Sequence, residues 1–349
     1  MNDIHEIELP RLVVVGRKVV KKLGEVSCSF GFKKALIVTG RTTLEIAGRQ
    51  ASMILRESGL EANTIIVNEA NLKNVNLVKT KSIEEKSDVI IGVGGGKTID
   101  VAKLGATWVG KPFISVPTTA SHDGISSSSA SIKDLGKPYS VKAKVPIAVL
   151  GDSSIIAESP YRFTASGCGD VISKVVAVSD WKMAHEIKGE YYGEYASSLA
   201  LMSSTLVRSN ATLIRDRLES GYRVLLEALV SCGVAMSIAG SSRPCSGSEH
   251  LFSHALDLIA PNSALHGEQC SIGTILMAKL HDLDWESLVR DLKIIGVPTT
   301  AKELGVSRED IIKAILMAKT IRSERFTILN KVNLTRESAE KLAVECGVI

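Results

Sequence analysis

Hydrophobic and polar residues alternate with two different periods in the first part of the chain. Short apolar runs bounded by polar or turn-forming residues predict β-strands, and the amphipathic segments between them predict α-helices. The predicted strands cover residues 34–39, 63–67, 88–92 and 112–116, and the predicted helices cover residues 43–57, 75–86 and 98–106. Strands and helices that alternate at this spacing predict a doubly wound parallel sheet.

The pattern changes between residues 131 and 152. Residues 134–138 contain glycine and proline and predict the turn of a hairpin that leads into a strand at 146–150. Beyond residue 153 only helical signals remain, and the helices are predicted at 172–185, 195–208, 223–239, 246–257, 271–281 and 285–295. We therefore predict an N-terminal α/β domain over residues 1–155 and an all-α C-terminal domain over residues 156–349.

Composition adds limits to this picture. A chain of 349 residues suggests two domains, and a hydrophobic content of 45% with only 4% aromatic residues predicts cores of Val, Ile, Leu and Ala. The net charge of +4 comes from interspersed Lys, Arg, Asp and Glu, so nucleic acid is not a favoured partner. The apolar stretch 229–240 is too short to span a bilayer and predicts a buried helix.

The expected compartment is the cytoplasm. The six cysteines are scattered without a C-x-x-C pair, which fits a reducing environment. The first residues lack a basic start followed by an apolar run, so no signal peptide is predicted.

Three consecutive glycines, Gly94 to Gly96, connect a predicted strand to a helix that is expected to start near Thr98. Glycines let backbone N–H groups approach a pyrophosphate, and the positive end of the helix would face the anion. A Rossmann G-x-G-x-x-G fails because Lys97 stands at the third glycine, and a Walker A loop fails because Ile91 stands at its first glycine. The alternative is a turn that is glycine-rich for steric reasons alone.

Residues 117–129 follow the next strand and are rich in hydroxyl groups, with one carboxylate at Asp123. Open α/β sheets bind ligands at this carboxyl edge. An ordinary polar loop would have the same composition.

One carboxylate and three histidines in the second half predict a divalent-metal site. His250 and His254 are four residues apart and share one face of a predicted helix, and His266 follows after a short loop. Asp170 closes the segment Gly167-Cys168-Gly169-Asp170 upstream. A carboxylate with two imidazoles leaves one position open, as at a catalytic zinc. The alternative is a set of surface or core histidines without a metal.

These motifs resemble the family of iron- and zinc-dependent alcohol dehydrogenases, glycerol dehydrogenases and dehydroquinate synthases over nearly the whole chain. Within it, residues 118–124 and 240–250 are similar to the archaeal glycerol-1-phosphate dehydrogenase family. The resemblance implies reduction of dihydroxyacetone phosphate to sn-glycerol-1-phosphate with NADH or NADPH, for the backbone of archaeal membrane phospholipids.

The resemblance also implies roles for individual residues. Asp170, His250 and His266 would hold zinc, with iron as the alternative, and Asp170 would also contact the substrate. His254 would face the substrate and relay a proton, and Asp123 would contact substrate hydroxyl or phosphate groups. The dinucleotide would be held by Gly94, Gly95, Gly96, Lys97, Thr98, Ile99, Asp100, Thr118, Thr119, Ala120, Ser121 and Ser127.

Arg41 bears on the choice of cofactor. The first predicted strand ends without the acidic residue that binds a ribose hydroxyl in NAD-preferring relatives, and Arg41 could pair with a 2′-phosphate instead. NADPH is therefore expected to be accepted, unless Arg41 is a solvated loop charge. The glycine turn and the metal ligands are predicted on different domains, so the active site is expected in the cleft between them.

Three competing functions stay open. A dehydroquinate-synthase-like lyase would need several cations near the metal, where the sequence offers only Arg243 and Lys174. Glycerol dehydrogenase differs in whether its pocket accepts phosphate. A regulatory protein that kept the fold and lost turnover is the non-enzymatic alternative. We expect a small phosphorylated substrate and a homo-oligomer that is not a membrane protein, and no pattern assigns the residues that bind the phosphate.

Overall fold

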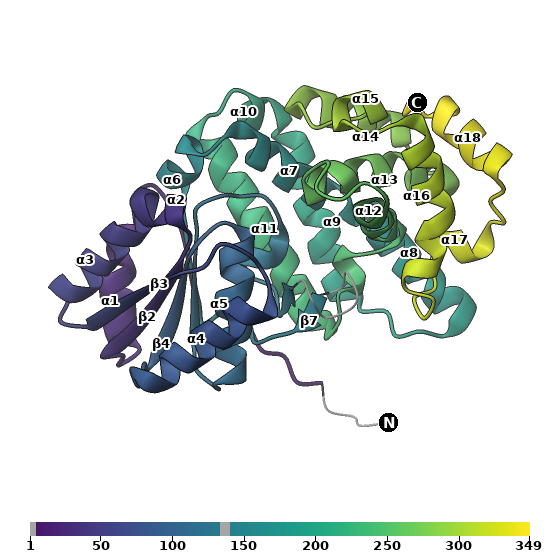
Figure 1. Ribbon diagram of the computed structural model, residues 1–349. Helices are drawn as coiled ribbons and strands as arrows, with labels where there is room; N and C mark the ends of the chain where they lie inside the picture. Colours follow the sequence, from purple (N-terminus) through teal and green to yellow (C-terminus); the bar gives the residue numbers. More distant parts are fainter. Residues whose placement is uncertain (1–4, 133–139) are drawn as a thin grey trace. The chain divides into compact units, whose positions relative to one another are not determined.

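The chain divides into two compact units. The computed structural model describes residues 5–132 and 140–349 and splits at Pro160 and Tyr161 (Figure 1). We call the first the α/β unit and the second the helical unit. The boundary predicted near residue 155 falls within α6 (Ser153–Glu158), the last helix of the α/β unit.

The α/β unit is built on a six-stranded parallel sheet, as predicted. Its strand order is β1-β8-β5-β4-β2-β3, which places β4 and β5 inside the sheet. All residues of these two strands are buried, as in sheets that are covered on both faces. The strands are β1 (Leu12–Gly16), β2 (Lys34–Thr39), β3 (Glu61–Ile66), β4 (Val89–Gly94), β5 (Phe113–Pro117) and β8 (Ala148–Asp152).

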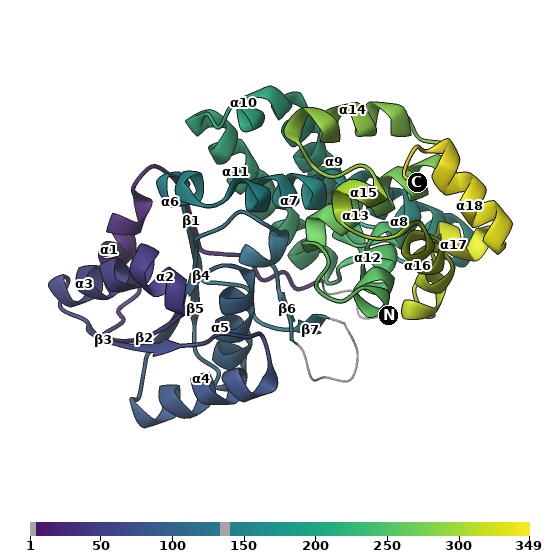
Figure 2. The ribbon, with the colours of Figure 1, turned by 45° about the horizontal axis from the view of Figure 1, so that its top comes forward.

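Helices cover both faces of this sheet (Figure 2). Ile91 of β4 packs into an apolar cluster with residues of α1 and α3, and its neighbour Ile90 packs into a second cluster with residues of α4 and α5. This alternation follows from the two-residue period of a strand. The elements are η1 (Val19–Lys22), α1 (Leu23–Ser29), α2 (Arg41–Thr43), η2 (Leu44–Gly48), α3 (Arg49–Glu57), α4 (Leu72–Glu84), α5 (Gly96–Trp108) and η3 (Asp123–Ile125).

The predicted hairpin is partly described. Strands β6 (Ser129–Ser131) and β7 (Ser140–Lys142) pair antiparallel, with Ala130 opposite Val141. The predicted turn at 134–138 lies outside the described residues.

The helical unit contains no strand in residues 161–349, so the all-α prediction is confirmed. Its elements are α7 (Tyr161–Ile172), α8 (Lys174–Lys188), α9 (Glu194–Ser209), α10 (Ala211–Arg215), α11 (Glu219–Ala239), η4 (Arg243–Cys245), α12 (Ser248–Ile259), α13 (His266–Leu280), α14 (Trp285–Ile295), α15 (Ala301–Leu304), α16 (Arg308–Ile321), α17 (Ile328–Lys331) and α18 (Arg336–Glu345).

Several boundaries differ from the prediction. Strand β1 and helices α7, α16 and α18 were not predicted. Helix α13 begins at His266 and therefore five residues before the predicted start at 271. Helix α5 begins at Gly96, ahead of the expected start near Thr98.

Helix α11 is the one helix among the described residues that is long and apolar enough to cross a membrane. Within its most apolar window, 72% is buried inside the protein, and it packs against α9. Leu225, Leu229 and Cys232 are fully buried on it. These contacts agree with the predicted buried helix.

Candidate functional site

Three loops of the α/β unit meet at the carboxyl ends of its inner strands. Gly94 at the end of β4 lies opposite Pro117 at the end of β5, and the backbone N–H of Thr118 donates to the Gly94 carbonyl at 3.0 Å. Val93 of β4 lies opposite Thr39, so the loop after β2 reaches the same edge. Parallel open sheets bind ligands at such an edge.

At two glycines of the turn, Gly94 and Gly96, a neighbouring side chain lies so close that it leaves no room for a Cβ atom. A Cβ atom on Gly94 would lie 2.7 Å from the Cβ of Thr98, and one on Gly96 would lie 1.9 Å from Nε2 of His122. Any side chain at Gly96 would therefore displace His122 from the start of α5. His122 was not among the predicted site residues, although it lies within the hydroxyl-rich loop, where its Nδ1 accepts a hydrogen bond from Gly124 at 2.9 Å.

The residues predicted to bind the dinucleotide differ in which of their polar groups are available to a ligand. The Thr118 hydroxyl oxygen is buried and has no hydrogen-bond partner among the described residues. The side chain of Ile99 lies in the apolar core, and both carboxylate oxygens of Asp100 are bonded, to Lys103 at 3.3 Å and to the Ser131 N–H at 3.0 Å. Only the backbone groups of Ile99 and Asp100 are therefore available to a ligand at this edge of the sheet.

The remaining predicted positions lie around the same loops. Gly95 caps α5 in an extended conformation, Ala120 and Ser127 are buried, and Ser121 and Thr119 are partly buried. Exposed Lys97 and buried Thr98 lie in the first turn of α5, and exposed Arg41 begins α2 directly after β2.

Lys103 holds the hydroxyl-rich loop in place. This fully buried side chain donates from Nζ to the carbonyls of Gly124 and Ser129 at 2.6 Å each. Burial lowers the pKa of Lys103, although the nearby Asp100 acts to raise it. The loop therefore folds around the buried amino group of Lys103, and partly buried Asp123 lies in the 3-10 turn of that loop.

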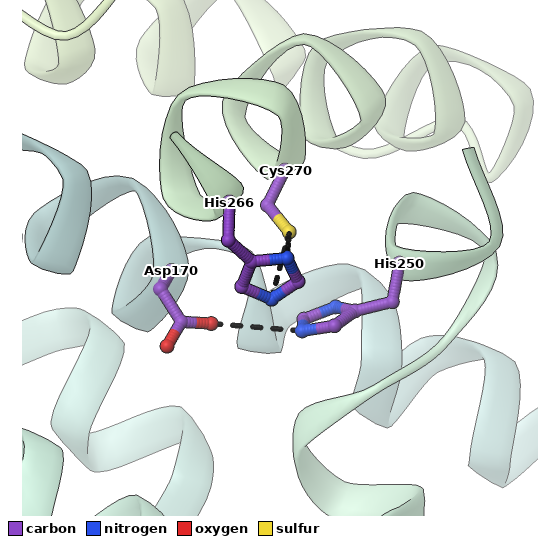
Figure 3. Close-up of side chains that lie close together, drawn as sticks. All are labelled: Asp170, His250, His266 and Cys270. Carbon is purple, nitrogen blue, oxygen red and sulfur yellow. Dashed lines mark hydrogen bonds and ion pairs between the residues drawn. The ribbon is translucent and has the colours of Figure 1, made fainter. Parts of the chain in front are cut away.

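The helical unit brings four potential metal donors together (Figure 3). One ligand atom each of Asp170, His250, His266 and Cys270 lies within 4.8 Å of all the others. Nε2 of His250 is 3.6 Å from Oδ1 of Asp170, and Sγ of Cys270 is 3.6 Å from Nε2 of His266. Three donors would leave a zinc position open, and Cys270 is a fourth donor beside them.

The helices that carry Asp170 and His266, α7 and α13, cross at a pair of glycines. A Cβ on Gly169 would lie 2.3 Å from the carbonyl oxygen of Gly267, and a Cβ on Gly267 would lie 1.8 Å from that of Ser166. Each glycine is the chain neighbour of a donor, Asp170 on α7 and His266 on α13. Two backbones in near contact thus bring these donors together.

Neighbouring polar groups orient the two imidazoles. Nδ1 of His250 bonds Oε1 of Glu249 at 2.7 Å, and Nδ1 of His266 lies 3.2 Å from the hydroxyl of Ser253. In both rings the Nε2 atom is thereby directed to the cluster. Hydrogen bonds of this kind fix the orientation of metal-binding histidines.

The cluster is electrostatically coupled. Burial would raise the pKa of Asp170, but Nζ of Lys174 at 2.6 Å and the two histidines hold it well below its ordinary value. Burial would lower the pKa of His250, but Cys270 and Asp170 raise it well above its ordinary value. Burial would raise the pKa of the Cys270 thiol, but His250 and His266 lower it to about 7. Asp170 and Cys270 on one side and the two histidines on the other thus favour each other's charged forms, whereas His250 acts to lower the pKa of His266.

His254 lies beside the cluster. Its ring centroid is 6.4 Å from that of His250 and 6.1 Å from that of His266. The pKa of His254 lies well below its ordinary value. Burial is the largest cause, and nearby His266, His250, Arg322 and Arg325 lower the pKa further. The imidazole is therefore neutral near pH 7.

Full-length relatives identify the family. The chain is 50% identical to glycerol-1-phosphate dehydrogenase [NAD(P)+] of Thermococcus sibiricus over 99% of each chain. It is 49% identical to the enzyme of that name from Methanosarcina mazei, over 98% of this chain and 96% of the relative.

Broader comparisons agree on the fold. A family model described as iron-containing alcohol dehydrogenase matches residues 14–160. A probable glycerol dehydrogenase from Sinorhizobium meliloti has a similar structure, with a TM-score of 0.79 and 22% identity over 98% of each chain. The chain belongs to the glycerol-1-phosphate dehydrogenase [NAD(P)+] family.

Proposed function

We infer that the chain catalyses NAD(P)H-dependent reduction of dihydroxyacetone phosphate to sn-glycerol-1-phosphate. The observation that carries this inference is identity of about half of all positions, over the full length, to relatives named for that activity. The buried donor cluster and the glycine turn supply the two sites that such a reaction needs.

We propose that Asp170, His250 and His266 hold a zinc ion. The donor set fits this group, since zinc binds carboxylate oxygen, imidazole nitrogen and thiolate sulfur. The neighbouring sulfur of Cys270 favours zinc over harder metals. A bound zinc ion supplies Lewis acidity that polarises a substrate carbonyl.

We assign the predicted residues at the edge of the α/β unit to the dinucleotide, which supplies the hydride. The unpaired buried hydroxyl of Thr118 supports the fit, as does the glycine cradle that a Cβ would fill. Exposed Arg41 supports use of NADPH, because a guanidinium pairs well with a 2′-phosphate. An Arg41→Ala variant should raise the Michaelis constant for NADPH and leave that for NADH unchanged.

His254 and Asp123 complete the proposal. The neutral imidazole of His254 would relay a proton from water to the reduced substrate oxygen. Asp123 would accept a hydrogen bond from a substrate hydroxyl, for which its fixed 3-10 turn provides a rigid support.

We place the enzyme in the cytoplasm, where its product would enter the backbone of archaeal membrane lipids. A homo-oligomer is supported by helix α9, on which Tyr195, Met202 and Leu206 are exposed by 71%, 51% and 44%. Exposed apolar side chains at this spacing share one face of a helix.

Following NADPH absorbance with dihydroxyacetone phosphate tests the function. The enzyme as purified should oxidise NADPH, enzyme stripped by a chelator should not, and added zinc should restore the rate. The absence of oxidation by metal-loaded enzyme with either NADPH or NADH would overturn the proposal. Faster turnover of unphosphorylated dihydroxyacetone would favour a glycerol dehydrogenase.

A further inference from the structure

A buried carboxylate outside the donor cluster links α8 to three other helices of the helical unit. Asp180 lies in the middle of α8 and is fully buried. Its Oδ2 atom accepts from the Ser248 N–H at 2.6 Å, and its Oδ1 atom accepts from the Ile328 N–H at 2.6 Å. Nε2 of His281 lies 2.9 Å from the same Oδ1. The carboxylate thus ties α8 to the starts of α12 and α17 and to the end of α13 (Figure 1).

The backbone partners of Asp180 suit a carboxylate. Ser248 is the first residue of α12 and Ile328 is the first residue of α17, and the first N–H groups of a helix have no acceptor within that helix. A negative group near a helix N-terminus is also stabilised by the helix dipole. Both residues are buried, so Asp180 satisfies N–H groups that would otherwise lack a partner.

The turn before α12 lies directly against α8. A Cβ atom on Gly247 would lie 2.6 Å from Oδ2 of Asp180 and 2.8 Å from the Cα of Ala177, which precedes Asp180 by about one helical turn. The backbone at Gly247 therefore has no room to move toward α8. The hydrogen bond from Ser248 to Asp180 opposes movement away from α8. The position of the first turn of α12 is thus fixed in both directions.

The same turn orients a proposed metal ligand. The Gly247 N–H donates to Oε1 of Glu249 at 2.8 Å, and that oxygen also bonds Nδ1 of His250 at 2.7 Å. The other oxygen of Glu249, Oε2, is buried and has no hydrogen-bond partner among the described residues. The hydrogen bonds that hold this carboxylate therefore all pass through Oε1. Asp180 is connected to the His250 ring through one turn of backbone and one carboxylate.

We propose that Asp180 is a positioning residue for the metal ligand His250. By fixing the backbone at residues 247–248, Asp180 holds Glu249 in the place from which it directs Nε2 of His250 toward Asp170. This inference rests on the proposed zinc centre and adds to it a residue that does not touch the ion. Groups that orient a metal-binding histidine typically change metal affinity by about ten- to one-hundred-fold.

Asp180→Asn tests the proposal with a side chain of nearly the same size. An NH₂ group replaces one carboxylate oxygen, so a donor now meets a donor on one side of the residue. We expect zinc affinity to fall about ten- to one-hundred-fold, measured by competition with a chromogenic chelator. The visible absorption of the cobalt-substituted enzyme should also change, because it depends on the arrangement of the ligands around the ion. Unchanged zinc affinity would overturn the proposal.

His281→Leu is the matched control. It removes a different partner from the same carboxylate and leaves the bond between Ser248 and Asp180 in place. The unfolding midpoint should fall, whereas zinc affinity and the cobalt spectrum should stay as in wild type. Equal losses of zinc affinity in His281→Leu and Asp180→Asn would assign Asp180 to overall stability and would overturn the positioning role.

Gly247→Ala tests the same contact from the other side. It leaves the carboxylate of Asp180 intact and pushes the turn away from α8, so zinc affinity should again fall. Combined with Asp180→Asn, it should add less than its separate effect, because both changes act at one contact. If Asp180→Asn does not fold, Gly247→Ala decides the matter, and wild-type zinc affinity in that variant would overturn the proposal.

The proposed function and the role of Asp180 can fail separately. A wild-type enzyme that binds zinc but reduces no dihydroxyacetone phosphate would overturn the function and leave the affinity comparison intact. A wild-type enzyme that reduces this substrate, together with an Asp180→Asn variant that binds zinc equally tightly, would overturn the role of Asp180 alone. If wild type binds no zinc, both the metal centre and the role of Asp180 are overturned.

Discussion

The carboxylate of Asp170 serves two cations. Its Oδ1 atom bonds the ammonium of Lys174 at 2.6 Å and also faces His250 in the donor cluster. Both residues of the ion pair are buried, so neither charge is stabilised by solvent. An ion bound by the cluster would therefore share a carboxylate that Lys174 already compensates.

Replacing Lys174 with Met should make stability depend on metal. Without metal, the buried carboxylate loses its partner, and the free energy of unfolding should fall by about 3 kcal/mol. With zinc in excess, the loss should shrink because the ion compensates Asp170. Urea unfolding in chelator and in zinc measures both values.

Lys313→Met controls for the loss of a lysine, since Lys313 is exposed and 3.8 Å from Glu309. Its effect should stay below about 1 kcal/mol in either condition. An identical loss for Lys174→Met with and without zinc would contradict the shared-carboxylate argument.

His254→Ala separates proton transfer from metal binding. Because the His254 ring lies beside the cluster, we expect its loss to lower turnover about 10²- to 10⁴-fold. Bound zinc should stay at about one ion per chain. Steady-state kinetics and elemental analysis give the two readings. Loss of zinc from the variant would make His254 a ligand instead.

At the scale of elements, the start of α5 depends on space beside His122. We expect Gly96→Ala to weaken NADPH binding, because the added Cβ displaces the His122 ring or the turn itself. Fluorescence titration with NADPH measures the affinity. Adding His122→Ala to Gly96→Ala should recover part of it, and a double variant as weak as the single one would place the cause in the turn.

The sequence predicted the sheet well because its inner strands are short, continuous apolar runs, as in β4. Helix α7 was missed for a physical reason. Gly167 and Gly169 within it each disfavour a helix by about 1 kcal/mol relative to Ala, and packing against α13 overrides that preference.

A wrong helix start also hid one potential metal donor, Cys270. The helix predicted from residue 271 began after Cys270, so the four-residue spacing between His266 and Cys270 was not recognised as one helical face. His122 was missed because only the folded chain shows its ring over Gly96. Residue type and spacing indicated Asp170 with His250, His254 and His266, and only the family resemblance set His254 apart from the ligands. The structure brings ligand atoms of Asp170, His250 and His266 together.

At the scale of the whole molecule, the donors come from one unit only. Asp170 lies on α7, His250 on α12, and His266 and Cys270 on α13. Removing metal should therefore loosen these helices and leave the parallel sheet unchanged. Hydrogen exchange followed by mass spectrometry should show faster exchange in α7, α12 and α13 after chelation, with β4 and β5 unaffected. Faster exchange throughout both units would contradict this localisation.

The contact between Gly169 and Gly267 limits how the metal centre can be re-engineered. Because two backbones touch there, no substitution at either position can widen the separation of Asp170 and His266 without moving a whole helix. A laboratory programme seeking bulkier ketone substrates would gain nothing by randomising these two codons.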